Sequence, residues 1–427
     1  MTTDATDAPQ RPAPDRPVAE LVRNAAYWRW VAATMLHRLP PIMAPMALIW
    51  ASTHYTGSPA VGGLLVGLAT LPCILAAPLF SRLLERWGRE RWTPRVLALG
   101  GAARLGVAGG FVAHAPVPVL FALSLVGNMA TFGVGGAIRT LLRTTVPQRL
   151  IGSALSLDAV LVELVVVGAP FVVVVCALFG PAYALFIMGA AMLTNAVLLW
   201  PRPKPVSEAG GQAAGKEAAK ADADDGIAPD VPESAGVWRN PAFLFWALVT
   251  MAFGHFLGTA EVGALPRVAL SGGGTTEAAI LTGVLGASSA AAGLVYAWYV
   301  TRIRLSLSVR AVALLLTMTA GCLVIAEASG WWALVGAFAM LGLCAAPLNS
   351  VMTEAPGYVV PRSRMSEAFS VLVATQSIGY SFAGGLLAVV SVHHMLLLGP
   401  VTAVLALLAA VVLRPARAAA ALGAAAR

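Results

Sequence analysis

Charged side chains are scarce in this sequence. Asp, Glu, Lys and Arg make up 11% of the 427 residues, whereas ~25% is usual for a soluble domain. Hydrophobic residues make up 58%, so a water-soluble fold of this size would have too few polar groups to cover its surface. We therefore expect much of the surface to face lipid rather than water.

Cysteine and histidine are also few, and their arrangement excludes several chemistries. The four cysteines stand singly inside apolar segments, without the paired spacing of a zinc site or redox motif. The scattered His, Cys and acidic residues form no cluster at helical spacing, so we expect no enzyme, no metal and no other cofactor. A Gly-x-x-x-x-Gly-Lys-Ser loop is missing, so ATP is not the expected direct source of energy.

Long apolar runs dominate what remains. Each is expected to be a helix, because the hydrocarbon offers no partner for an open backbone group and the alternation of a β-barrel is absent. The predicted fold class is thus an all-α membrane protein with twelve transmembrane helices. The runs are 28–52, 61–83, 96–115, 117–141, 153–179, 182–200, 243–265, 278–300, 311–328, 331–352, 367–390 and 394–413.

Arginines gather in alternate loops between these runs. The loops on the opposite side contain a single arginine, Arg267. This asymmetry is the positive-inside pattern, and it predicts a protein of the cytoplasmic (inner) membrane with both termini in the cytoplasm. This pattern also accounts for the net charge of +8 without a nucleic-acid-binding surface. The arginine-rich loops contain Arg82, Arg86, Arg89, Arg91 and Arg95, then Arg143 and Arg149, then Arg302, Arg304 and Arg310, then Arg362 and Arg364.

One long polar stretch, residues 201–240, interrupts the apolar runs and is interpreted as a flexible cytosolic linker. Segments VPQRLIGSALS (146–156) and VPRSRMSEAFS (360–370) resemble each other, and both precede the fifth span of their half. We therefore predict two six-helix bundles related by a pseudo-two-fold axis along the membrane normal. The expected organisation is a disordered cytosolic tail (1–27), an N-terminal bundle (28–200), the linker (201–240), a C-terminal bundle (241–414) and a cytosolic tail (415–427).

The loop between the second and third runs has the sequence SRLLERWGRER, residues 81–91. It resembles the signature loop of the major facilitator superfamily, usually Gly-x-x-x-Asp-Arg-x-Gly-Arg-x-Arg, with Ser81 in place of the usual Gly. Segments 153–170 and 366–385 also look like the fifth and eleventh spans of actinobacterial members of that superfamily. The matching loop positions are filled by Glu85, Arg86, Gly88, Arg89 and Arg91.

This resemblance implies a gate. In the family, the acidic residue of the loop meets the neighbouring half near the start of its eleventh span and latches the outward-open state. Carried over, Glu85 would face residues 363–366, where a helix start favours a carboxylate. Asp158, near the cytosolic end of the fifth run, is expected to meet the loop arginines and so to belong to the same gate. The alternative is that the loop arginines serve only as positive-inside anchors.

A few charges lie within the apolar runs. Such a charge costs at least ~2.5–3.5 kcal/mol near the bilayer centre, so each must be paired, hydrated or functional. Arg38 and Glu163 lie at similar depths in the first and fifth runs, which are neighbours in the family fold, so we predict an Arg38–Glu163 pair facing the central cavity. A purely structural bridge is the alternative. Arg104, inside the third run, is expected to snorkel or to pair structurally.

Other polar residues in the runs are candidates for lining the cavity. Glu261 lies near the outer end of the seventh run, and Asn128 lies in the fourth. Gln376 and Tyr380 share one face of the eleventh run at four-residue spacing. The alternative for each is a structural role, because hydrogen bonds between helices use the same residue types.

Together these features predict a secondary transporter that moves a small organic molecule by alternating access, most simply by proton-coupled efflux. Gly168-Ala169-Pro170 is similar to the Gly-Pro of the fifth span in family antiporters. The expected partners are a small-molecule substrate, protons and the lipid bilayer, with a monomer as the working unit. An importer or facilitator of a nutrient has the same fold. A non-transporting membrane receptor or scaffold is the alternative of another class.

The latch implied by the resemblance gives a first prediction. Glu85→Gln removes the negative charge that would hold the signature loop against the other half, so the outward-open state is expected to lose population and turnover is expected to change. Transport in proteoliposomes and the accessibility of labels on the two membrane faces measure both effects. If turnover and conformational balance stay as they were, Glu85 is not a latch.

Overall fold

The structure is a computed structural model that describes residues 21, 23–146, 150–200, 240–360 and 364–413, and every regular element within them is helical. The first part of the chain forms α2 (Ala25–Thr56), α3 (Pro59–Val66), α4 (Leu71–Trp87), α5 (Arg89–Val112), α6 (Val117–Thr145), α7 (Ile151–Ala177) and α8 (Tyr183–Leu198). The second part forms α10 (Pro241–Ala269), α11 (Thr275–Tyr299), the 3-10 turn η3 (Val300–Arg302), α12 (Leu307–Glu327), α13 (Trp331–Glu354), α14 (Pro356–Val359), α15 (Met365–Val389), α16 (Val392–Leu398) and α17 (Val401–Leu413).

The predicted all-helical membrane class is confirmed. Among the described residues, eight segments are long and apolar enough to cross a membrane, and three shorter apolar helices, Val117–Phe132, Leu164–Ala177 and Tyr183–Leu198, accompany them. The count of twelve spans stays a prediction. The eight segments are Pro59–Ala76, Glu90–Val112, Pro241–Ala269, Thr275–Tyr299, Leu307–Glu327, Trp331–Val359, Glu367–Val389 and Val392–Val412.

Two of the predicted runs are broken helices. The run 61–83 contains α3 and α4, which are separated by a turn at residues 67–70. The run 394–413 contains α16 and α17, which are separated at Gly399 and Pro400. Proline lacks the N–H that would continue the hydrogen-bond ladder, which explains the second break. Helix α2, in contrast, continues through its internal prolines Pro40, Pro41 and Pro45.

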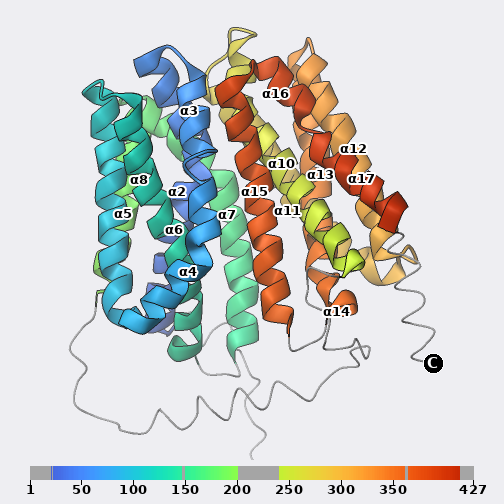
Figure 1. The fold of residues 1–427 in the computed structure, drawn as a ribbon, viewed down its shortest axis with the longest axis horizontal. Helices are drawn as coiled ribbons and strands as arrows, with labels where there is room; N and C mark the ends of the chain where they lie inside the picture. The colour runs from blue at the N-terminus through green and yellow to red at the C-terminus, as the bar shows by residue number, and fades with distance from the viewer. Residues whose placement is uncertain (1–20, 22, 147–149, 201–239, 361–363, 414–427) are drawn as a thin grey trace, which may run out of the picture.

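The helices form two groups, which lie side by side in Figure 1. In the first group α2 packs on α3, α6, α7 and α8, and in the second α10 packs on α11, α12, α15 and α17. The groups meet where α7 contacts α11 and where α3 contacts α15, with α2 against α10 between them. The predicted domain boundaries stay predictions, because most of the predicted linker lies outside the described residues.

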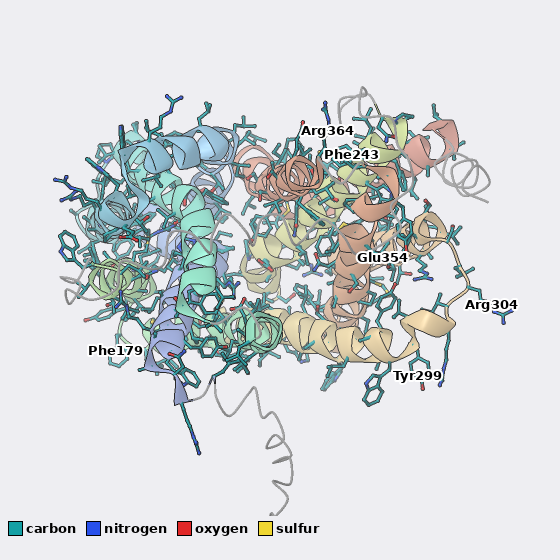
Figure 2. The ribbon with its side chains drawn as sticks, turned by 90° about the horizontal axis from the view of Figure 1, so that it is seen from below. Phe179, Phe243, Tyr299, Arg304, Glu354 and Arg364 are labelled. Carbon is teal, nitrogen blue, oxygen red and sulfur yellow. The ribbon has the colours of Figure 1, made fainter. Side chains whose placement is uncertain are left out.

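Large apolar side chains point outward from both groups. Phe179 is 67% exposed and Tyr299 is 49% exposed, and Figure 2 shows both at the margin of the bundle. Trp298 and Trp332 are 79% and 80% exposed. A soluble surface rarely exposes so many large apolar groups, and aromatic residues near helix ends are typical of the membrane–water interface. The outward faces are therefore suited to lipid.

Arg267 is the exception to the arginine asymmetry, and its contacts explain it. The side chain is only 7% exposed. Its Nε donates to the Ile325 carbonyl at 2.8 Å and its Nη2 donates to the Ala328 carbonyl, at the end of α12. The last carbonyls of a helix lack partners within that helix and attract a cation. Arg267 therefore has a structural role, capping α12 from the end of α10.

Helix α15 lies between α10 and α3, and glycines allow the close approach on both sides. A Cβ added to Gly254 of α10 would overlap the carbonyl oxygen of Gln376, and one added to Gly379 of α15 would overlap that of Met251. On the other side, a Cβ on Gly67, in the turn after α3, would overlap the Gly385 backbone. Because these neighbours are backbone atoms, no side-chain rotation could relieve the overlap.

The contacts between the two groups lie toward one end of the bundle. Gly384, late in α15, faces Gly67 after α3, and Gly286, early in α11, faces Val167, late in α7. The arginine-rich loops lie at the other ends of these helices, as the course of α4 and α15 in Figure 1 shows. The two groups are thus closed on each other at the end away from the arginines.

This packing predicts that a single methyl group opens the closed end. Gly67→Ala should separate α3 from α15, because the new Cβ has only backbone to displace. Gly109→Ala is the matched control, since a Cβ there meets nothing within 4 Å. We expect longer distances between nitroxide labels at Thr56 and His393 in Gly67→Ala only, measured by double electron–electron resonance. An unchanged distance distribution in Gly67→Ala would contradict this account of the closure.

Candidate substrate cavity

A cavity of about 290 Å³ lies between the two helix groups, with both contributing to its wall. Its size is near the lower limit of small-molecule sites, ~300–1,000 Å³. The first group contributes residues from α2, α3, α5, α6 and the turn at Thr70, and the second contributes residues from α10 and α15. The polar lining residues are Thr70, Arg104, Asn128 and Thr131 from the first group and Glu261, Gln376, Ser377 and Tyr380 from the second.

Arg104 of α5 is the one cation among these lining residues, and the expectation that it snorkels to the interface is wrong. The side chain is 7% exposed, and its Nη2 donates to Asn128 Oδ1 at 3.2 Å and to Thr131 Oγ1 at 3.0 Å. Its Nε lies 3.1 Å from the sulfur of Met192. Within the described part of the chain no carboxylate pairs with Arg104. Neutral groups therefore hold a buried positive charge in place.

Glu261 of α10 is the acidic group of the cavity wall. Tyr380 of α15 donates its hydroxyl hydrogen to Glu261 Oε2 at 2.6 Å. The tight α10–α15 packing at Gly254, Gly258 and Gly379 fixes the distance between the two helices and hence the geometry of this bond. Among the described residues, no lysine, arginine or histidine forms an ion pair with Glu261. The carboxylate is thus oriented by a neutral donor, and its charge is not balanced by a neighbour.

The remaining predicted lining residues lie on both sides of the same cavity. Asn128 of α6 accepts from Arg104 and donates through Nδ2 to Thr70 Oγ1 at 3.0 Å. Gln376 lies one helical turn before Tyr380 and lines the cavity with it. Sequence reasoning missed Thr131, although its spacing from Asn128 places both on one face of α6.

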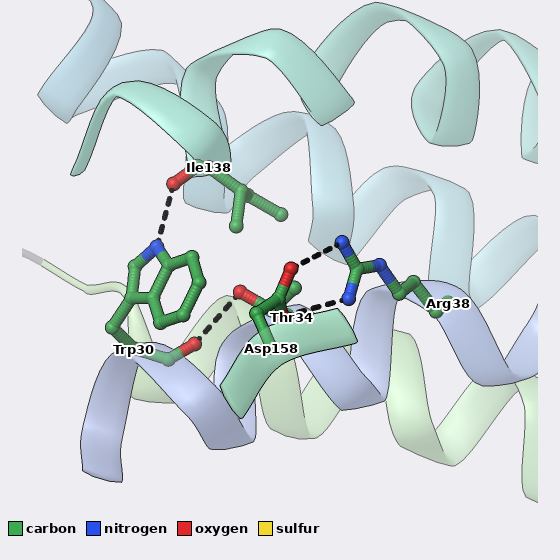
Figure 3. Close-up of polar contacts among 5 residues, drawn as sticks. All are labelled: Trp30, Thr34, Arg38, Ile138 and Asp158. Carbon is green, nitrogen blue, oxygen red and sulfur yellow. Dashed lines mark hydrogen bonds and ion pairs between the residues drawn. The ribbon is translucent and has the colours of Figure 1, made fainter. Parts of the chain in front are cut away.

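Arg38 does not have the partner expected for it. Its Nη1 and Nη2 donate to Asp158 Oδ1 and Oδ2 at 2.8 and 2.9 Å, a bidentate ion pair between α2 and α7 (Figure 3). The predicted Arg38–Glu163 pair is therefore corrected to Arg38–Asp158. Asp158 lies about one and a half helical turns closer to the start of α7 than Glu163, which brings its short side chain level with Arg38.

A local network surrounds this pair. Thr34 Oγ1 donates to the Trp30 carbonyl at 2.9 Å, and Trp30 Nε1 donates to the Ile138 carbonyl at 3.0 Å, linking α2 to α6 (Figure 3). Arg38 precedes the first cavity residue of α2, Pro41, by about one turn. The pair therefore lies between the cavity and the arginine-rich end and joins helices of one group only.

The gating loop is described in part. Gly88 has φ 92° between α4 and α5, a backbone conformation that favours glycine, and Arg86 and Arg91 are exposed beside it. The side chains of Glu85, Arg89 and Glu163 lie outside those the structure describes, as do residues 361–363 opposite the predicted latch. Asp158 pairs with Arg38, and the side chains of Arg82 and Arg89 lie outside those described, so its predicted contact with the loop arginines stays a prediction.

This architecture is shared with known proteins. A family model for the Major Facilitator Superfamily matches residues 31–316, more than half of the chain. The chain belongs to the Major Facilitator Superfamily. The family suggested by the loop at residues 81–91 is therefore confirmed, and the chain belongs to a family of transporters rather than of enzymes.

Solved structures of the superfamily show the same fold. A peptide transporter POT in complex with sulfate is 13% identical with a TM-score of 0.65, covering 93% of this chain and 95% of its own. A mutant of the nucleoside transporter NupG is 13% identical with a TM-score of 0.65, covering 91% and 99%. A bacterial homolog of the human lysosomal transporter Spinster, inward-facing and occupied, is 16% identical with a TM-score of 0.63, covering 94% and 98%. No curated protein is found to match the sequence.

The Arg38–Asp158 pair yields a stability prediction. Asp158→Asn should strand the Arg38 charge, but since the two side chains are 21% and 12% exposed, the loss should stay below the ~3–5 kcal/mol of a fully buried pair. The double variant Arg38→Met, Asp158→Leu should recover part of the lost stability. Thermal unfolding in detergent measures each.

The control for this cycle is Glu327→Gln. Glu327 lies 3.7 Å from His393, and both side chains are exposed, so its loss should leave unfolding nearly unchanged. In an additive cycle the double variant would lose as much stability as Arg38→Met and Asp158→Leu lose together. That result would contradict a coupled Arg38–Asp158 pair.

Proposed function

We propose that this superfamily member moves a small organic molecule across the cytoplasmic membrane by alternating access, with proton entry driving export. The observation that carries the proposal is the cavity shared by the two helix groups, with Arg104 on one wall and Glu261 on the other. Rocking one group against the other would change the separation of these walls, so a ligand between them can bias the motion.

The closed end of the bundle is proposed to be the outer gate. The arginine distribution supports a cytoplasmic location for the opposite end, with both chain termini on that side. Contacts at Gly67 and Gly384 and at Gly286 and Val167 then seal the cavity from the outside. The conformation is therefore one in which the cavity would load or release from the cytoplasm.

Glu261 is proposed as the coupling group. A carboxylate in this wall can bind a proton or the cationic group of a substrate, but one occupant displaces the other. Proton and substrate then load alternately, which is what exchange requires. The Tyr380 hydroxyl at 2.6 Å keeps the carboxyl in one orientation for both occupants. The resemblance of Gly168-Ala169-Pro170 to the antiporter motif supports export rather than import.

Two other functions use the same geometry. A nutrient importer or facilitator would share the cavity and differ in gating and in the gradient used. A receptor or scaffold would bind a ligand in the cavity without moving it, and it would show no counterflow. A monomer suffices for the proposed function, because the cavity wall is complete within one chain.

Proteoliposomes with an imposed pH gradient test the proposal. A pool of small neutral, anionic, cationic and zwitterionic compounds is offered, and accumulation is quantified by mass spectrometry against empty liposomes. Wild-type protein should concentrate at least one compound in response to the gradient. Glu261→Gln should no longer concentrate that compound, because its amide cannot carry a proton. Exchange should persist only at a higher concentration of the compound, because the amide binds a cationic group less tightly than the carboxylate does.

Two matched variants separate the outcomes. Glu327→Gln removes an exposed carboxylate at the edge of the bundle and should concentrate the compound like wild type. Glu163→Gln tests the other acidic candidate from the sequence. If Glu261→Gln accumulates as well as wild type while Glu163→Gln does not, coupling belongs to Glu163. If no compound moves in any variant, transport itself is the wrong function.

A further inference from the structure

We propose that the substrate is a small zwitterion, with its anionic group bound by Arg104 and its cationic group bound by Glu261. The inference rests on the proposed function and goes beyond it by naming the substrate class. Four observations carry it: the state of each charge, their position on opposite helix groups, the apolar part of the cavity lining and the size of the cavity.

Arg104 is held but not neutralised. A guanidinium has five N–H donors, and the described bonds use Nε, which faces a thioether sulfur, and Nη2, which faces Asn128 and Thr131. No bond from Nη1 is among those of the described residues. An arginine fixed by neutral acceptors, with donors left over, is suited to bidentate binding of a carboxylate or another planar anion.

Glu261, on the opposite wall, carries the opposite charge and is also held by a neutral partner. Its Oε2 accepts from Tyr380 at 2.6 Å, and no bond to Oε1 occurs among the described residues. An ammonium group offers three donors to such a carboxylate and would supply the positive charge that the described neighbours do not. The two walls thus require ligand groups of opposite sign.

A ligand with one charge satisfies only one wall. An anion would pair with Arg104 and leave Glu261 uncompensated, and a cation would do the reverse. Removing one partner from a desolvated pair is costly because the other charge remains unpaired. A zwitterion pairs with both walls at once and leaves the net charge of the filled cavity unchanged. Complementarity of this kind determines specificity more than raw affinity.

The rest of the wall limits the body of the ligand. Besides its polar groups, the cavity is lined by apolar side chains that include Ile42, Leu48, Phe132 and Leu257. The cavity volume of about 290 Å³ is near the lower limit of small-molecule sites, ~300–1,000 Å³. The ligand is therefore a small molecule whose middle is hydrocarbon, in the size range of an amino acid.

Simple compounds of one length but different charge test this proposal on the purified full-length protein. The probes are ε-aminocaproate, with hexanoate and hexylamine as its single-charge analogues, and leucine, with isocaproate and isoamylamine. Binding is measured as the ligand-induced shift in thermal unfolding, followed by tryptophan fluorescence. At least one zwitterion should bind about tenfold or more tightly than both of its analogues, since each analogue loses one charge-assisted contact.

Variants assign each end of the ligand. Arg104→Gln should abolish the preference for the zwitterion over the amine while retaining the preference over the acid. Glu261→Gln should do the opposite. Arg302→Gln and Glu327→Gln remove exposed charges of the same two kinds outside the cavity, so they should leave both preferences as in wild type. The comparison of probes on wild-type protein stands even if a cavity variant does not fold.

Each outcome bears on one claim. If an acid or an amine binds as tightly as its zwitterion, or if no zwitterion binds, the substrate class is wrong. In that case accumulation of some other compound in the proteoliposome assay would leave the transport function standing. If zwitterions bind with the expected preference but no compound is moved, the substrate class stands and transport fails.

Discussion

The cost of placing a charge within the hydrocarbon governs how this molecule is built. A protein with so few charged residues retains only some of them within its helices, and each must be compensated. Arg267 is compensated by the end carbonyls of α12, and Arg38 by the carboxylate of Asp158. Arg104 and Glu261 have only neutral partners among the described residues. Of these four charges, the two held by neutral side chains alone line the cavity, where a ligand can supply the opposite charge.

Helix α15 links this electrostatic arrangement to the packing. Gly379 allows contact with α10, Gly384 allows contact with the segment after α3, and Gln376 and Tyr380 line the cavity between them. Gln376, Tyr380 and Gly384 follow one another at four-residue spacing and so lie along one side of the helix, with Gly379 beside them on the side of α10. One element thus seals the closed end and orients Glu261 through Tyr380. A movement of α15 at the closed end would reach the Glu261 carboxylate directly through the Tyr380 hydroxyl.

The architecture could be predicted from the sequence better than the partners of the buried charges. Long apolar runs and the loop at residues 81–91 were enough for the membrane class and the family, since lipid permits few alternatives. The polar residues Asn128, Glu261, Gln376 and Tyr380 line one cavity as predicted, with Asn128 on one wall and the other three on the opposite wall. The partner of Arg38 was predicted one and a half turns from its true position, because relative helix heights depend on packing that sequence does not reveal. Of the two expectations for Arg104, a structural pairing agrees better with its contacts to Asn128 and Thr131 than snorkelling does, because the side chain is buried.

The location of each charge on one helix group or on both determines what it can do in a conformational cycle. Arg38 and Asp158 both belong to the first group, so rocking the groups leaves their distance unchanged and their pairing cannot favour one state. Arg104 and Glu261 belong to different groups, so their separation must change whenever the groups move. A ligand shifts a conformational equilibrium only by its difference in affinity for the two states. A molecule bound to both charges spans the two groups, so its affinity depends on their separation, whereas the charged contact of a molecule bound to one charge stays within one group. The charge arrangement that selects a zwitterion is therefore also the arrangement that lets binding drive the change of access.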